Sequence, residues 1–266
     1  HYCGYTIQLP PHCAECQSTE LKMMGFGTEK VEEEIASLFP AAKVERLDFD
    51  TARTRTAYER IISDFEKGKT QILIGTQMLS KGLDFGNVSV VGILNADNLM
   101  NYPDFRAHER AFQLMVQVSG RAGRRDKRGT VVLQTSQPEH PLIRMVQHFA
   151  YREMVRLQLS ERSMFRYPPY YRLIVLVLRS RNETVLQEMS TIYAEKLRVR
   201  LGERVLGPVT PPVTRVQTLH IKKIVLKIEI AAAIAPVREI LEAIHSEMQR
   251  YLPFKQLIVH YDVDPA

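Results

Sequence analysis

The sequence predicts an α/β protein with two domains: a layered domain over residues 21–159 and a smaller α+β domain over residues 160–266. A short cysteine-bearing module is expected before them, over residues 1–20. In the layered domain, apolar strand-like runs alternate with amphipathic helical segments, which favours a parallel sheet with helices on both faces. In the second domain the expected order is β-α-β-β-α-β, and Tyr167-Pro168-Pro169-Tyr170 interrupts the chain near its start.

Composition narrows the class of protein. The 266 residues are 45% hydrophobic and 25% charged, as in globular proteins, and no run of 18 apolar residues predicts a membrane span. The net charge is +6, and 16 basic against 11 acidic residues lie from Ser160 onward. This charge is compatible with nucleic acid but does not require it. Because the chain has no Trp, stacking on nucleobases would fall to Tyr or Phe.

All three cysteines fall in the first 16 residues. Cys13 and Cys16 form a C-x-x-C pair that can reach one tetrahedral zinc ion, and Cys3 precedes the pair by nine intervening residues. The fourth cysteine of a zinc ribbon would stand just before His1, so we expect the chain to start inside such a module, with Zn²⁺ weakly held or absent. His1 or His12 is a weaker candidate for the fourth ligand. Three unrelated thiols are the alternative.

The elements of the first domain follow from the period of their apolar residues. Helices are expected from Thr28 to Phe39, over residues 53–67, from Phe105 to Val118 and from Pro138 to Leu159, and strands near Leu21 and over Lys43–Phe49, Gln71–Gly75, Val88–Leu94 and Gly129–Thr135. We expect Thr28 to cap the first helix through its hydroxyl.

The second domain is organised around two split β-α-β units. Strands are expected over Tyr171–Arg179, Val205–Pro208, Val213–Leu219, Ile221–Ile230 and Leu257–Val263, and helices over Asn182–Leu201 and Pro236–Arg250. This order indicates a ferredoxin-like domain.

Gly68-Lys69-Thr70 resembles the end of a phosphate-binding P-loop, but we reject that interpretation. A P-loop follows a strand and opens a helix, whereas this tripeptide follows a helix and precedes a strand. Gly68 is better explained as the glycine that ends the helix. With no Walker A or D-E-x-H pattern elsewhere, the chain lacks the parts that hold a triphosphate and magnesium.

Two stretches carry candidate chemistry. Gln117 to Arg124 has the pattern Q-x-x-G-R-x-G-R, in which Arg121 and Arg124 offer two guanidinium groups that match phosphate oxygens. A basic turn after a helix is the alternative.

The second stretch runs from Thr76 to Phe85. Thr76 and Gln77 follow a buried strand, where ligands of parallel sheets bind and where a hydroxyl and an amide suit phosphate and sugar contacts. Asp84 could accept a hydrogen bond from a ribose hydroxyl. The alternative is an Asx turn at Asp84 and a core-facing Thr76.

These two stretches resemble motifs V and VI of superfamily 2 helicases. The combination is similar to the primosomal protein N′ family of replication-restart helicases, and the similarity covers nearly the whole chain. It also rests on the C-x-x-C module, Gly25-Phe26-Gly27-Thr28-Glu29, Asp48-Phe49-Asp50-Thr51, Tyr167-Pro168-Pro169-Tyr170 and Asp262-Val263-Asp264-Pro265.

The resemblance implies an ATP-dependent 3′-to-5′ DNA helicase for replication restart and primosome assembly. The chain would supply its RecA-like second lobe and an S10-like C-terminal domain, while Mg²⁺ and most of the ATP site would belong to a first lobe. Arg121 and Arg124 would be arginine fingers and Gln117 would sense the nucleotide. The resemblance places Gly82 and Asp84 at ATP, and Thr76, Gln77 and Lys81 at DNA.

The same resemblance implies the partners of the second domain. Lys222 and Lys223, with Lys227 and Arg215 on one open sheet face, would contact DNA phosphates. Branched and single-stranded DNA, the tail of single-stranded DNA-binding protein and the restart and helicase-loading proteins are the expected partners. The expected place is the bacterial cytoplasm, near the nucleoid.

The chain departs from the family pattern at its front. It lacks the first motor lobe, the N-terminal DNA-binding domains and the upstream cysteines, so we expect no ATPase activity from it alone. Two alternatives stay open: the second lobe of another superfamily 2 repair helicase, or a non-enzymatic zinc-ribbon and ferredoxin-like module that binds nucleic acid.

Overall fold

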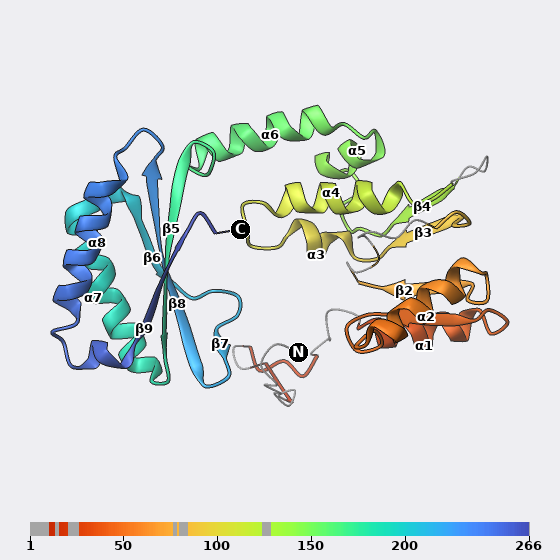
Figure 1. Cartoon of the computed structure of the whole chain (residues 1–266), viewed down its shortest axis with the longest axis horizontal. Coiled ribbons are helices and arrows are strands. Elements are labelled where there is room, and N and C mark those ends of the chain that lie inside the picture. The colour runs from red at the N-terminus through yellow and green to blue at the C-terminus, as the bar shows by residue number, and fades with distance from the viewer. Residues whose placement is uncertain are drawn as a thin grey trace. The chain divides into compact units, whose positions relative to one another are not determined.

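A computed structural model describes residues 11–13, 16–20, 27–76, 79, 85–123 and 129–265 (Figure 1). The chain divides into two compact units, and their boundary in the sequence falls between Val155 and Arg156, inside helix α6 (Tyr151–Met164). Within this described part, no helix is both long enough and apolar enough to cross a membrane.

The first unit begins with a small α/β layer. Its elements are α1 (Thr28–Leu38), β1 (Val44–Leu47), α2 (Arg55–Glu66) and β2 (Ile72–Gly75). Strands β1 and β2 are parallel, with Leu47 opposite Gly75 at their carboxyl ends. Among the described residues, the buried core of this layer is Leu47, Ile61 and Phe85.

The rest of the first unit is built on a second parallel pair. Its elements are β3 (Val90–Ile93), α3 (Ala96–Met100), α4 (Ala107–Ser119), β4 (Thr130–Leu133), α5 (Pro141–Gln147) and the first residues of α6. Strand β3 pairs with β4, and Ile93 and Leu133 pack on a core formed mainly by α4 and α5. The opposite face is open, because Val90 and Val132 are 63% and 56% exposed.

This arrangement corrects one expectation. Instead of one parallel sheet covered on both faces, the described residues form two separate two-stranded pairs, and β3–β4 is covered on one face. Within the first unit, the expected helix from Pro138 to Leu159 is broken at Phe149, whose φ of 50° lies in the left-handed region. Helix α3, capped by Asn95, was not expected because its five residues are too few to show a period.

The helix ends show which capping expectations hold. Gly68 has φ 71°, and its N–H donates to the Phe65 carbonyl, so the prediction that it ends a helix is confirmed. The Thr28 prediction is wrong. Gly27 occupies the cap position without a side-chain bond, and the Thr28 hydroxyl donates instead to Asp48 on β1's carboxyl side.

The second unit is one antiparallel sheet with two long helices. Its strands are β5 (Tyr171–Ser180), β6 (Val205–Val209), β7 (Arg215–Val216), β8 (Leu219–Glu229) and β9 (Ile258–Val263); its helices are α7 (Glu183–Leu201) and α8 (Ile234–Met248), with short 3₁₀ turns η2 (Gly202–Arg204) and η3 (Pro253–Gln256). The sheet order is β6–β8–β5–β9, and β7 also pairs with β8. The expected β-α-β-β-α-β order is confirmed.

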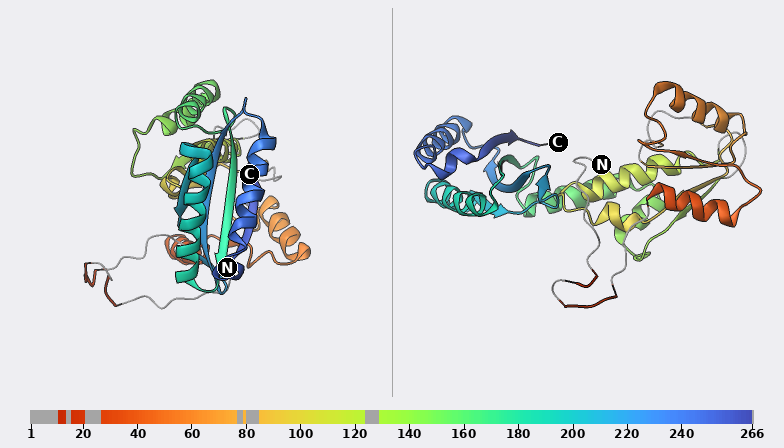
Figure 2. Two further views of the ribbon diagram at one scale, coloured as in Figure 1. Left: turned by 90° about the vertical axis from the view of Figure 1, so that its left-hand side faces the viewer. Right: turned by 90° about the horizontal axis from the view of Figure 1, so that it is seen from below.

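Helices α7 and α8 lie side by side over one face of this sheet (Figures 1 and 2). Between them and the sheet lies a single core of 18 buried residues in the described chain, centred on side chains such as Leu176, Tyr193 and Leu226, which are 0% exposed. Asn182 caps α7 by accepting from the Val185 N–H, as predicted.

Strand alternation corrects the expected lysine face. Lys222 and Lys223 are neighbours on β8, so they project from opposite faces. Lys222 shares the helix-covered side with Ile224, and its Nζ donates to the Thr210 hydroxyl at 2.8 Å. Lys223 and Lys227 project from the other face.

Lys227 contacts the segment that precedes β5. Its Nζ donates to the Phe165 carbonyl at 2.6 Å and lies 3.6 Å from the centroid of the Tyr167 ring. Burial, and then the nearby charge of Arg166, lower the pKa of Lys227 below its ordinary value. This lysine therefore fixes the Tyr-Pro-Pro-Tyr segment to the sheet.

Candidate functional site

The carboxyl ends of β1 and β2 form one edge of the first unit. Thr76 follows Gly75 directly and is exposed, so the alternative of a core-facing Thr76 is wrong. Gly75 is required here, because a Cβ on it would lie 2.5 Å from the Leu47 carbonyl oxygen and 2.7 Å from the Leu79 side chain. The sheet edge therefore presents a hydroxyl to solvent. Gln77, Lys81, Gly82 and Asp84 lie outside the described residues.

The second predicted stretch begins on the last turn of α4. Gln117 is exposed there, and Arg121 is half-buried in the turn that follows, where its N–H donates to the Val118 carbonyl. Gly123, with φ 79°, then donates its N–H to the Val88 carbonyl at 3.0 Å. Arg124 lies outside the described residues.

The turn that carries Arg121 is held against the start of β3. A Cβ on Gly129 would lie 2.3 Å from the Gly123 nitrogen, so the residues that flank 124–128 are in direct contact. Val88 also packs on the core of Leu47 and Phe85. The structure thus holds Gly123, two residues after Arg121, against Val88, four residues after Asp84.

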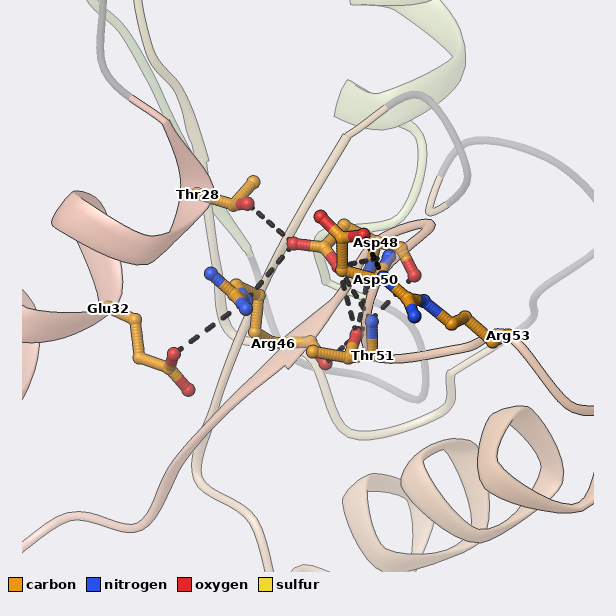
Figure 3. A network of polar contacts seen from close by, with 7 residues as sticks. All are labelled: Thr28, Glu32, Arg46, Asp48, Asp50, Thr51 and Arg53. Carbon is orange, nitrogen blue, oxygen red and sulfur yellow. Dashed lines mark hydrogen bonds and ion pairs between the residues drawn. The ribbon is translucent and has the colours of Figure 1, made fainter. Parts of the chain in front are cut away.

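A polar network fixes the edge beside Thr76 (Figure 3). Asp48 follows β1 and is 6% exposed. Its Oδ2 accepts from the Thr28 hydroxyl at 2.5 Å and lies 3.0 Å from Arg46 Nε. Its Oδ1 accepts from the backbone N–H groups of Asp50 and Thr51, both at 3.0 Å. The carboxylate therefore ties the start of α1 to the end of β1.

Electrostatics keep Asp48 ionised. Burial acts to raise the pKa of its carboxyl, but the hydrogen bonds from Thr28 and Thr51 and the charge of Arg46 outweigh burial and hold the pKa below its ordinary value. Glu32 lies 3.7 Å from Arg46 Nε and adds a second partner. Two carboxylates therefore share one guanidinium, and Arg46 joins α1 to β1 through them.

A second carboxylate, missed by the sequence analysis, lies at the carboxyl ends of β3 and β4. Asp97 accepts from the Thr135 hydroxyl at 2.6 Å and from both the N–H and the hydroxyl of Ser136 at 2.8 Å. These bonds lower the pKa of Asp97. The available sequence signal was an aspartate just after an apolar strand.

The cysteine pair lies in a hydrogen-bonded turn. The Cys13 N–H donates to the Ser18 carbonyl at 2.9 Å, and the Gln17 N–H donates to the Cys13 carbonyl at 3.0 Å. Cys16 is exposed and Cys13 half-buried. Cysteines at C-x-x-C spacing can supply two corners of a tetrahedral zinc site. Cys3 lies outside the described residues, and no group of three metal ligands occurs within them.

The second unit contains an aromatic cluster on α7, α8 and β9. The hydroxyls of Tyr193 and Tyr261 are 2.5 Å apart and lie 3.3 Å and 3.1 Å from His245 Nδ1. Burial lowers the pKa of His245. The cluster borders a cavity of about 490 Å³ that Gln249 and Lys255 also line. These contacts make His245 a structural element of the second unit.

Both units match families of known proteins. Residues 16–126 match the family described as "Helicase conserved C-terminal domain", and residues 163–266 match the "Primosomal protein N C-terminal domain". The first match contains Thr76, Gln117 and Arg121. The chain therefore belongs to the class of proteins in which a helicase C-terminal domain is followed by a primosomal C-terminal domain.

Curated relatives identify the family. The chain is 36% identical to the replication restart protein PriA of Bacillus subtilis over 268 residues, 39% identical to that of Synechocystis over 219 residues, and 35% identical to that of Treponema pallidum over 269 residues. These alignments cover 100%, 81% and 100% of this chain and 33%, 26% and 40% of the relatives. The chain belongs to the PriA family, and it spans about a third of the length of these relatives.

Proposed function

We propose that the chain is the second motor lobe and the C-terminal domain of an ATP-dependent 3′-to-5′ DNA helicase that restarts replication in the bacterial cytoplasm. The observation that supports this proposal is the contact of the turn after α4 with Val88, which follows the Thr76–Phe85 stretch. The Gly123–Val88 hydrogen bond and the Gly123–Gly129 contact hold the Arg121 turn beside the segment that follows Asp84. An arginine finger and a nucleotide-facing Gly-x-Asp must share one wall of an ATP site.

In this proposal one set of residues in the lobe acts on ATP and another set binds DNA. Arg121 and Arg124 steady the charge that develops on the γ-phosphate, Gln117 senses the nucleotide, and Gly82 and Asp84 approach it. Thr76, Gln77 and Lys81 hold the backbone of one DNA strand, so that closure of the lobes moves the strand. ATP brings the transferable phosphoryl group, and Mg²⁺ is held mainly by a first lobe.

The second unit supplies partner contacts. Its strand order β6–β8–β5–β9 supports a ferredoxin-like, S10-like domain. Lys223 on the open face remains a candidate for branched DNA, while Lys222 would act from the helix-covered side. The tail of single-stranded DNA-binding protein and the restart and helicase-loading proteins are the proposed protein partners. Filter binding of forked DNA by Lys223→Ala checks the lysine, and unchanged binding would remove it from the site.

Zinc is proposed for the cysteine turn. Cys13 and Cys16 would hold two of its positions and Cys3 a third, and the metal would fix the turn rather than react. Elemental analysis of the purified chain tests this. We expect zinc to be lost in Cys16→Ser, and a metal-free parent chain would refute the site in this sequence.

The ATP site is tested by complementation. The chain alone should hydrolyse no ATP on forked DNA, whereas the chain joined to a first motor lobe should. In the joined protein, Arg124→Ala should reduce turnover by about 10³-fold or more. The matched control is Arg125→Ala, which removes an equal charge from the same basic turn. Equal losses in both variants would favour the basic-turn interpretation, and turnover by the chain alone would reveal a missed phosphate-binding loop.

A further inference from the structure

The loop after β1 exposes one large aromatic side chain. Phe49 is 78% exposed, although its neighbours on both sides are held by hydrogen bonds. Water-exposed phenylalanine is unfavourable by itself, and nothing in the local turn requires a large apolar residue at this position. The turn is rigid because the buried Asp48 carboxylate accepts from two of its backbone N–H groups (Figure 3). The ring is therefore presented to solvent on a fixed support.

Within residues 27–76, Phe49 stands apart from the other exposed large apolar side chains, which are Leu38 and Phe39 at the end of α1. Helix α1 begins at the carboxyl end of β1, where Thr28 contacts Asp48, and its 11 residues extend roughly 16 Å toward the opposite edge. These described residues therefore do not extend Phe49 into the contiguous apolar patch that a protein-binding site would need.

The surroundings of Phe49 suit a nucleic acid. Arg53 in the same loop and Arg55 at the start of α2 have 71% and 91% of their side chains exposed. Their ion pairs with Asp50 and Glu59 lie at the surface, where such pairs are weak enough for a phosphate to compete. Each carboxylate of the loop has an arginine beside it, since Asp48 lies 3.0 Å from Arg46, which Glu32 shares, and Asp50 pairs with Arg53 at 3.0 Å. A flat apolar ring among hydroxyls and cations offers a base a stacking surface and its backbone polar contacts.

The position of Phe49 agrees with this assignment. Leu47 and Gly75 are register partners on neighbouring strands, which lie about 5 Å apart. Asp48 and the exposed Thr76 therefore leave the same sheet edge on neighbouring strands, and Phe49 is the next residue after Asp48. We propose that Phe49 is a base-stacking residue of a single-stranded DNA path that passes Thr76. This inference rests on the proposed DNA contact of Thr76 and adds recognition of the base to recognition of the backbone.

The absence of Trp from the sequence gives a direct test with the full chain. Phe49→Trp introduces a single fluorophore at the proposed contact, and oligothymidylate should quench its emission. Phe39→Trp, on the other edge of the same layer, is the matched control and should not respond. Quenching in both variants, or in neither, would overturn the proposal. A change of Phe49→Trp emission with protein concentration alone would overturn it in favour of contact between protein molecules.

Affinity measurements separate stacking from backbone contact. Phe49→Ala should weaken oligothymidylate binding about tenfold, and Phe49→Tyr should restore it. On an abasic strand the parent chain and Phe49→Ala should bind equally. The salt dependence should be the same for both proteins, because stacking releases no counterions.

The outcome also distinguishes this inference from the proposed function. If the parent chain binds DNA and Thr76→Val weakens binding while Phe49→Ala does not, the stacking assignment alone fails. If the parent chain does not bind, or Thr76→Val binds as the parent does, the proposed DNA path fails and the stacking assignment fails with it.

Discussion

The two units of the chain are stabilised in different ways. In the second unit, 18 described buried residues form one continuous core between a sheet and two helices. In the β1–β2 layer of the first unit, three described residues are fully packed, and charged groups such as Asp48 and Arg46 join the elements instead. This difference between the two units concerns which surfaces stay exposed and can bind a ligand. The proposed DNA path needs an edge with exposed hydroxyl and guanidinium groups, and such an edge cannot also be sealed by apolar packing.

The largest effect is expected in the continuous core. Leu226→Ala should lower the free energy of unfolding of the second unit by about 3 kcal/mol, because it leaves a cavity beside a side chain that is 0% exposed. Urea unfolding followed by circular dichroism measures it. Leu252→Ala, at a side chain 76% exposed, is the control and should change stability by less than about 0.5 kcal/mol. Equal effects would mean that the core is not the source of stability.

In the first unit, the largest loss of stability is expected from a substitution of a polar residue. Asp48→Asn should lower its stability by about 1–3 kcal/mol, because the pair with Arg46 is lost while the buried guanidinium remains. Asp50→Asn is the matched control at an exposed ion pair, with an expected change of about 0–1 kcal/mol. Urea midpoints at pH 7 compare the two.

The contribution of Asp48 has a defined pH window. Its pKa is lower in the folded chain than in the unfolded chain, so its stabilisation is present above the ordinary value of about 4 and is lost as pH falls through the folded value. The gap between the parent chain and Asp48→Asn should therefore close in strong acid. A gap that stayed constant from pH 7 to pH 2 would contradict the network.

The smallest effect concerns His245 in the second unit. Burial lowers its pKa, so the neutral ring stabilises the fold above the ordinary value of about 6.5, and this contribution is lost as pH falls below it. Stability should decline from pH 7 to pH 5 by at most about 1.4 kcal/mol per pH unit. His245→Gln should flatten the decline.

How much of the structure can be predicted from the sequence depends on how far apart in the chain the interacting residues lie. Gly68 and Asn182 were predictable because capping is local. Strands β5 and β8 were predictable from a strongly apolar run and from an alternating run. The break at Phe149 left no mark in the apolar period. The Lys222 expectation failed because neighbouring residues of a strand face opposite ways.

The site was predicted at the level of motifs and not of contacts. Thr76 and the Arg121 turn were found from their patterns, and their positions at a strand end and at the end of α4 agree with that. The Asp48 network was missed because it joins Thr28 to a residue 20 positions away, and a capping role for Thr28 looked sufficient. Pairings across that distance require the fold.

The bond between Thr28 and Asp48 has a mechanical consequence. Residues 11–20, with the cysteine turn, precede α1, and the first helical residue is anchored to the loop that carries Phe49. A displacement of the first turn of α1 would therefore be passed to this loop through the Thr28 hydroxyl and the Glu32–Arg46 ion pair. Thr28→Val would remove the hydroxyl's part of this connection and leave the ion pair in place.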